Sequence, residues 1–284
     1  MCLAVIAIQA HRDWPLIVLA NRDEFHARPA TPIGPWQEAR AVLGGIDLQA
    51  GGTWLATDIR GRLALLTNVR DPAKQKANAP TRGDLPRSYL LENISSQSYL
   101  QRLAPNASQF NGFNLVLADG PHAVWHASNY QAPFAQPIKP GVHGLSNASL
   151  NTAWPKTDRV VQRVRAHLEQ GGTPDTAYLM SIMRDFEGAP DQSLPVTGLT
   201  IERERLLASP FIVSPDYGTR CTTLLMRHRS GAAWVQEDRF DARGERVARV
   251  VWQHEAHVVG RAHSAWSQVE DGVGSRITAW SAST

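Results

Sequence analysis

LAVIAI at residues 3–8 is followed, after a polar break at residues 11–15, by LIVLA at residues 16–20. Both segments are short and almost wholly apolar. Apolar runs of this length that are bounded by turn residues are typical of buried strands. The sequence therefore predicts two buried strands joined by a turn.

Strand pairs of the same kind are predicted further along the chain. They are expected at residues 53–56 with 63–67, at 113–118 with 123–126, and later at 222–226, 232–237 and 247–253. Two helices are predicted between them: residues 155–170 carry an apolar stripe that ends at Gly171-Gly172, and Thr173-Pro174-Asp175 is the N-terminal pattern of a second helix that reaches about Phe186.

This order of strands, helices and strands lacks the strict alternation of a parallel doubly wound sheet. It predicts a layered α+β domain with largely antiparallel sheets. One domain is expected at residues 1–260. Residues 261–284 are rich in Ser, Ala, Gly and Thr, which predicts a flexible C-terminal tail, although Trp266 and Trp280 argue against it.

Composition and charge exclude several classes of protein. Of the 284 residues, 43% are hydrophobic and 19% are charged, which is a globular composition. The net charge of +3 is not gathered into any run, so we expect no nucleic-acid partner. The apolar runs are far shorter than the roughly 18 residues that span a bilayer, and no basic leader is present, so no membrane span and no signal peptide are expected. Two cysteines cannot form a disulfide framework, which favours free thiols and a reducing, cytoplasmic location.

Cys2 is the first candidate for chemistry. A small second residue permits removal of the initiator methionine, which leaves Cys2 with a free α-amine. An α-amine titrates near about 7.8 and a thiol near about 8.5, so the amine is able to accept the thiol proton at neutral pH. Cys2 is therefore either a nucleophile that carries its own base or an incidental second residue.

Further polar candidates lie at predicted strand ends. Arg22 and Asp23 follow the strand that ends at Ala20, where a guanidinium and a carboxylate would favour a thiolate and orient the amine. Asn68 and Asn147 carry amides that are able to donate to an oxyanion, and Arg220 is a candidate for binding a substrate carboxylate. The alternatives are a solvated loop, turn-capping asparagines and an ordinary surface arginine.

Competing motifs have less support. His254 and His257 are three residues apart on a predicted strand, so their rings point to opposite faces and no metal site is expected. The pairs Gly44-Gly45 and Gly51-Gly52 match no nucleotide-binding pattern. Cys221 is either redox-sensitive or, more simply, a buried strand thiol.

Eight short segments together resemble the NRDE family, the Transport and Golgi organisation group of proteins. They are Met1-Cys2, Asn21-Arg22-Asp23-Glu24-Phe25, Gly51-Gly52-Thr53-Trp54-Leu55, Thr67-Asn68, Asn111-Gly112-Phe113-Asn114-Leu115, Gly144-Leu145-Ser146-Asn147, Thr152-Ala153-Trp154-Pro155-Lys156 and Tyr217-Gly218-Thr219-Arg220. The resemblance covers residues 1 to about 257, with the segments in the same order.

The resemblance implies a four-layer αββα sandwich like that of the N-terminal nucleophile hydrolases. In the choloylglycine-hydrolase-like branch, an N-terminal cysteine attacks an amide carbonyl with the help of arginines, an aspartate and asparagines. By similarity these roles fall on Cys2, Arg22, Asp23, Asn68, Asn147 and Arg220. Here Arg22 and Asp23 are adjacent rather than separated, and adjacent side chains of an extended chain diverge. Glu24 is therefore a further candidate for the role of Asp23.

Two classes of function follow from the resemblance. In the first, Cys2 hydrolyses a small non-peptide amide and needs no cofactor. In the second, the same cleft binds haem or a hydrophobic ligand such as a lipid or acyl-thioester for trafficking, with no turnover. The loops at residues 71–83 and 131–141 are expected to border the cleft.

Overall fold

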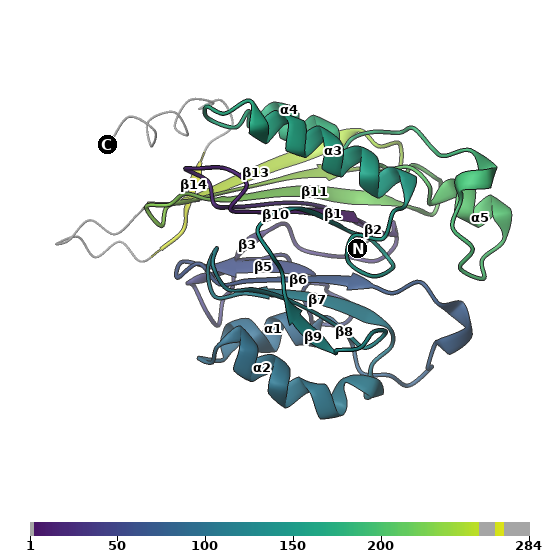
Figure 1. Ribbon diagram of the computed structural model, residues 1–284, viewed down its shortest axis with the longest axis horizontal. Coiled ribbons are helices and arrows are strands. Elements are labelled where there is room, and N and C mark those ends of the chain that lie inside the picture. Colours follow the sequence, from purple (N-terminus) through teal and green to yellow (C-terminus); the bar gives the residue numbers. More distant parts are fainter. Residues whose placement is uncertain (1–2, 256–264, 270–284) are drawn as a thin grey trace.

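The fold is built from two antiparallel sheets packed face to face. The computed structural model describes residues 3–255 and 265–269. Within these residues each sheet has seven strands, and helices cover the two outer faces (Figure 1). The predicted four-layer α+β sandwich of mainly antiparallel sheets is confirmed.

The first sheet contains the apolar segments near residues 3–20. Its strands, in spatial order, are β10 (Gly141–Leu145), β1 (Leu3–Ile8), β2 (Leu16–Phe25), β11 (Tyr217–Arg227), β12 (Ala233–Phe240), β13 (Arg246–His254) and β14 (Ser267–Val269). Strand β1 is an interior strand between β10 and β2. Its first described residue, Leu3, pairs with Asn21 of β2.

The second sheet is a meander in which every strand pairs with its neighbours in sequence. Its strands are β3 (Gly34–Pro35), β4 (Val42–Gly44), β5 (Leu55–Asp58), β6 (Leu63–Asn68), β7 (Phe113–Ala118), β8 (Val124–Ser128) and β9 (Ala135–Pro137). A short hairpin turn joins β5 to β6, where Gly61 has a φ of 94° that favours glycine, whereas the connection from β6 to β7 carries α1 and α2.

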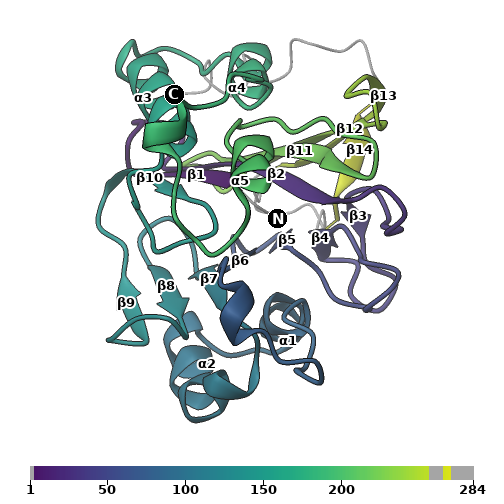
Figure 2. The ribbon, with the colours of Figure 1, turned by 90° about the vertical axis from the view of Figure 1, so that its right-hand side faces the viewer.

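Helices pack on both outer faces. Helices α3 (Pro155–Glu169) and α4 (Thr176–Ile182) cover the first sheet, and α1 (Asp84–Leu91) and α2 (Ser96–Leu103) cover the second, as the end-on view shows (Figure 2). The remaining helical segments are α5 (Ile201–Leu206) and the short turns η1 (Pro72–Lys74), η2 (Ala104–Gln109) and η3 (Asp191–Ser193). Each sheet is therefore buried on both faces.

Strand alternation divides the core into layers. Ala4, Ile6 and Ile8 of β1 face the second sheet, in the core between the sheets. Leu3 and Val5 point the other way and pack against the layer that contains α3 and α4. Because both faces are covered, β1 is apolar at every described position, which explains its continuous apolar run.

Two boundaries differ from those expected. The second helix begins at Thr176 and ends at Ile182, because Asp175 is its N-cap and accepts hydrogen bonds from the backbone N–H groups of Ala177 and Tyr178. Strand β2 continues to Phe25, because β11 continues to pair with it beyond Ala20.

The predicted tail also differs at residues 265–269. Trp266 is buried in the core between the sheets, and its indole N–H donates to the carbonyl of Ala41. Strand β14 pairs with β13. This part of residues 261–284 belongs to the folded domain, because burial removes the large Trp266 ring from water while Ser267 and Gln268 stay exposed.

Candidate functional site

Arg22 lies between the sheets at one end of the sandwich. Its side chain is only 4% exposed, and its guanidinium lies 4.5 Å from the centre of the Trp54 ring. A terminal nitrogen of Arg22 is 3.4 Å from Oδ2 of Asp47, and Nε of Arg28 donates to the same oxygen at 2.6 Å. Arg22 is thus part of an ordered charge cluster on a strand, and the solvated-loop alternative is wrong for it.

Asp47 is the carboxylate of this cluster. Burial alone would raise its pKa, but the hydrogen bond from Arg28 and those from the backbone of Ala50 and Gln49 outweigh burial and hold the pKa of Asp47 below its ordinary value. Asp47 therefore stays ionised and balances part of the positive charge of Arg22 and Arg28.

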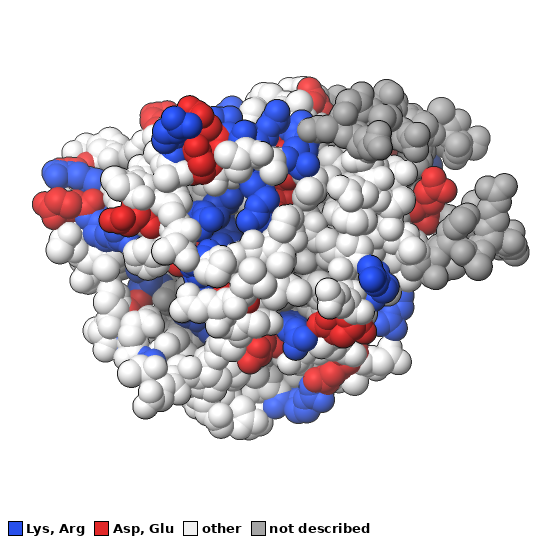
Figure 3. All heavy atoms as spheres, turned by 180° about the vertical axis from the view of Figure 1, so that it is seen from behind, with Lys and Arg blue, Asp and Glu red and all other residues white. Residues whose placement is uncertain are grey.

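A cavity of about 490 Å³ opens beside this cluster. Three guanidinium groups and two carboxylates line it, those of Arg22, Arg28, Arg82, Glu24 and Asp47. On the rear face of the molecule, Lys and Arg side chains gather around a hollow (Figure 3). The cavity is strongly polar and has a slight excess of positive charge.

Glycines shape one wall of the cavity. The backbones of Gly52 and Gly83 touch, and a Cβ at Gly52 would lie 2.4 Å from the carbonyl carbon of Gly83. The N–H of Thr53 donates to the carbonyl of Gly83 at 3.0 Å, which holds the two segments together. Only glycine fits at Gly52, and Gly51 has a φ of 76° that favours glycine, which together explain a glycine pair that matches no nucleotide motif.

Asn68 and Asn147 meet, but only Asn68 lines the cavity. Nδ2 of Asn147 donates to the backbone carbonyl of Asn68 at 2.9 Å, and the backbone of Arg70 donates to the carbonyl of Asn147 at 2.8 Å. Asn147 is therefore placed to hold the end of β6, while Asn68 is the amide beside the cavity.

Asp23 points away from Arg22, as adjacent residues of a strand do. Its Oδ1 accepts a hydrogen bond of 2.6 Å from the hydroxyl of Thr219. Asn21, on the same face of β2, donates to the carbonyls of Met183 and Pro210. This face turns toward the helical layer, so Asp23 lies outside the cavity lining and Glu24 lies within it.

Arg220 lies at a bulge of β11 between Thr219 and Cys221. One terminal nitrogen donates to the carbonyls of Phe25 and His26 at 2.9 Å and approaches that of Arg28 at 3.3 Å. Burial, with the nearby charges of Arg22 and Arg239, lowers the pKa of Arg220. Arg220 thus fixes the turn that carries Arg28, and it lies outside the cavity lining.

The structure describes one of the two cysteines. Cys2 lies outside the described residues, which begin at Leu3. Cys221 is buried between the sheets, and burial together with the charge of Glu237 raises the pKa of its thiol. The interpretation of Cys221 as a buried strand thiol is confirmed.

Several cavity residues were not singled out from the sequence. Asp47 shows a local pattern, because its Oδ1 accepts from the backbone N–H of Gln49 as in an Asx turn. Trp54 lies in a family segment, but its contact with Arg22 depends on the pairing of distant strands. Of the two loops expected at the cleft, residues 71–83 supply part of the lining, whereas residues 131–141 do not.

The described ranges 3–255 and 265–269 contain neither a cluster of metal-ligating side chains nor a long apolar helix. No group of three or more His, Cys, Asp or Glu side chains there is arranged to hold a metal ion. No helix in that part of the chain has the length and apolar character needed to cross a membrane.

The family model and the curated relatives that match this chain belong to one family. The family model described as Transport and Golgi organisation 2 matches residues 1–242. A Bos taurus protein named Transport and Golgi organization protein 2 homolog is 34% identical over 230 residues, which cover 76% of this chain and 83% of that protein. The Homo sapiens homolog is 31% identical over the same shares. Among solved structures, a Caenorhabditis elegans N-acylethanolamine-hydrolyzing acid amidase ortholog aligns with 79% of this chain and 92% of its own at 11% identity and a TM-score of 0.40.

Proposed function

We propose that this chain, which belongs to the Transport and Golgi organisation 2 family, also called the NRDE family, hydrolyses a small polar non-peptide amide with Cys2 as nucleophile. One observation carries the proposal: the buried guanidinium of Arg22 lines a polar cavity at the end of the sheet where β1 begins. Cys2 is joined by one peptide bond to Leu3, and Leu3 pairs with Asn21, the residue before Arg22.

The residues around the cavity suit this chemistry. The positive charge of Arg22 favours the thiolate form of a neighbouring cysteine. The side chain of Asn68 borders the same space and is a candidate donor to the oxyanion. Asn147 and Arg220 act as positioning residues, since they fix the end of β6 and the turn with Arg28. Glu24, rather than Asp23, is the carboxylate available to orient the α-amine.

The proposed reaction has two steps. The Cys2 thiol passes its proton to its own α-amine, and the sulfur attacks the amide carbonyl carbon. The C–N bond then breaks, and the leaving amine takes that proton, which leaves a thioester on Cys2. In the second step, water loses a proton to the α-amine and attacks the thioester. The C–S bond breaks, the proton returns to sulfur, and a carboxylic acid is released.

Intact mass and electrophile trapping test the proposal. We expect the mature chain to begin at Cys2 and to take up one equivalent of iodoacetamide at neutral pH. Cys2→Ala should abolish the labelling, whereas Cys221→Ala should leave it unchanged because Cys221 is buried. A mature chain that retains Met1 has no free amine on Cys2 and contradicts the mechanism. Release of a chromogenic amine from a panel of N-acyl anilides then tests turnover.

The alternative is binding without turnover of an anionic ligand, such as haem, in the same cavity. It is favoured by the three guanidinium groups of the lining, which suit carboxylates. The polar lining gives less support to a purely hydrophobic lipid or acyl-thioester. A saturable Soret shift on haem titration that Arg22→Gln weakens supports this alternative, and its absence at micromolar protein contradicts it.

A thiol nucleophile must stay reduced to react. For this reason we also propose a cytoplasmic location, which fractionation of cells that express the untagged protein tests directly.

A further inference from the structure

A second cavity, of about 200 Å³, lies where four hairpin turns of the two sheets converge. Its lining comes from the β1–β2, β5–β6, β7–β8 and β11–β12 turns, through Pro15, residues 59–61, residues 120–122, residues 227–229 and Gly231. Three arginines line it, Arg60, Arg227 and Arg229. It is separate from the cavity of Arg22, with which it shares no lining residue.

Arg227 is the buried group of this second cavity. Its side chain is only 4% exposed, and its guanidinium lies over the Trp266 ring at 5.6 Å. One terminal nitrogen donates to the hydroxyl of Thr57 at 2.9 Å and to the carbonyl of Asp58. Within the described part of the chain, its Nε has no hydrogen-bond partner and no carboxylate lies within ion-pair distance. Burial accordingly lowers the pKa of Arg227 to about 10.

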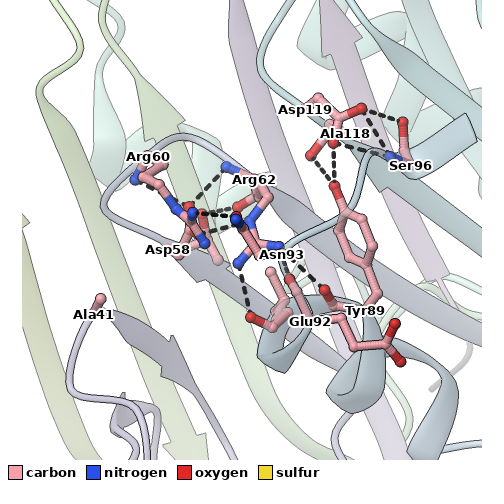
Figure 4. A network of polar contacts seen from close by, with 12 residues as sticks. Ala41, Asp58, Arg60, Arg62, Tyr89, Glu92, Asn93, Ser96, Ala118 and Asp119 are labelled. Carbon is pink, nitrogen blue, oxygen red and sulfur yellow. Dashed lines mark hydrogen bonds and ion pairs between the residues drawn. The ribbon is translucent and has the colours of Figure 1, made fainter. Parts of the chain in front are cut away.

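The nearby carboxylates are already engaged by other groups. Asp58 accepts from Nε of Arg60 at 3.2 Å and from Nε of Arg62 at 2.8 Å (Figure 4). Asp119, beside the β7–β8 turn, is turned toward α1 and α2, where it accepts hydrogen bonds from the hydroxyls of Tyr89 on α1 and Ser96 on α2 (Figure 4).

Asp13 is engaged in the same way, because Nε of Arg229 donates to it at 2.9 Å. Three guanidinium groups line the cavity, those of Arg60, Arg227 and Arg229, and the two nearby carboxylates are those of Asp13 and Asp58. The difference is one positive charge, which corresponds to the buried Arg227.

We propose that this cavity is a binding site for a phosphate group, either free phosphate or the phosphate of a small monoester. A phosphate at neutral pH carries close to two negative charges and offers several strong acceptor oxygens. It would balance the charge of Arg227, and its oxygens would accept from the forked donors of Arg60 and Arg229 at the rim and from Arg227 beneath them. A carboxylate has only two oxygens, whereas a phosphate has enough acceptor oxygens to serve all three guanidinium groups.

The probe for the test is inorganic phosphate, titrated calorimetrically into the full chain against sodium chloride of matched ionic strength. We expect saturable binding of phosphate and none of chloride. The double variant Arg60→Gln/Arg229→Gln should bind phosphate at least about ten-fold more weakly, because two charge-assisted contacts are lost. The matched control Arg102→Gln/Arg205→Gln removes two arginines of similar exposure from distant ion pairs and should leave the affinity unchanged.

Arg227→Met tests the buried group. We expect it to abolish binding without unfolding the protein, because it also removes a buried charge that has no carboxylate partner. Glycerol 3-phosphate in place of phosphate distinguishes the sources: tighter binding of the monoester identifies an organic phosphate, and weaker binding identifies the free ion. Phosphate binding no stronger than that of chloride, or an unchanged affinity in the Arg60→Gln/Arg229→Gln variant, would overturn the proposal. These outcomes are independent of labelling at Cys2.

Discussion

The two ends of the sandwich bury arginines in different ways. At the end where β1 begins, Arg22 stacks on Trp54 and faces the ionised Asp47, beside a wide cavity. At the opposite end of β2 and β11, the partners of Arg227 among residues 3–255 and 265–269 are a hydroxyl and a carbonyl. A buried charge with a partner is part of a stable site, whereas one without a carboxylate raises the energy of the empty protein and favours an anionic ligand. The same residue type between the same two sheets therefore has two roles.

The largest effect is expected at Asp58, the carboxylate whose charge acts on Arg227. Asp58→Asn should lower the free energy of unfolding by about 3–5 kcal/mol, because the buried Arg62 would lose its ion-pair partner and the buried Arg227 would lose the attraction of that carboxylate. Urea unfolding at neutral pH measures this. Asp191→Asn, at an exposed ion pair, is the matched control and should change stability little. A loss at Asp58 as small as that of the control would mean that this end of the sandwich tolerates unpaired charge.

Another buried basic side chain, that of His126, lies on β8 of the second sheet. His126 is fully buried, with Nε2 3.2 Å from the Oδ1 of Asn114, and burial lowers its pKa to about 4. Its folded pKa is below its unfolded value, so the unfolded state binds more protons as the pH falls. Stability should therefore drop by about 3 kcal/mol between about pH 6.5 and pH 4. His126→Gln should flatten this part of the pH profile, and the exposed His122→Gln should not.

Arg22 should matter more for reactivity than for stability. Arg22→Gln should slow iodoacetamide labelling of Cys2 at neutral pH about ten-fold, because loss of one nearby positive charge raises the thiol pKa by about one unit. The pH profile of the labelling rate should move to higher pH by the same amount. Arg227→Met, at the other end, should leave this profile unchanged. Equal effects of the two variants would remove the distinction between the two ends.

The smallest effect is expected at Asp47. Its pKa is lowered in the folded state, so the stability it contributes is present above its unfolded pKa and is lost as the pH falls through its folded pKa. Asp47→Asn should cost about 1 kcal/mol at neutral pH, since the pair is partly solvated. The difference in urea unfolding between wild type and variant should shrink below about pH 4. A difference that is constant with pH would mean that Asp47 acts through packing alone.

Much of the fold follows from local sequence. The apolar run of β1 and its repeat in β2 predict interior strands, and the stripe of α3 predicts a helix within one residue of its observed end. The short helices α1 and α2 were not predicted, because each has only eight residues, too few for a clear period. The extension of β2 to Phe25 depends on β11, which lies almost 200 residues later in the sequence.

The candidate site was predictable where one strand supplies it. Arg22 and Glu24 share a face of β2, and alternation alone separates them from Asp23. Asp47, Trp54 and Arg82 reach the cavity from the second sheet and its loops, so only the packing of the two sheets brings them to Arg22. The family segments identify Asn147, but its bond to the backbone of Asn68 joins a turn to the end of β6, 79 residues away in the sequence.

The pairing of β2 with β11 has a consequence for how the chain is made. Strands β1 and β2 emerge first from the ribosome, yet the central partner of β2 begins only at Tyr217. At a synthesis rate of about 5–20 residues per second, roughly ten to forty seconds pass before that partner exists. During this interval one hydrogen-bonding edge of an apolar hairpin lacks its native neighbour, and such edges favour aggregation. The nascent chain therefore has a defined period in which chaperone binding is most needed, and it ends when β11 is complete.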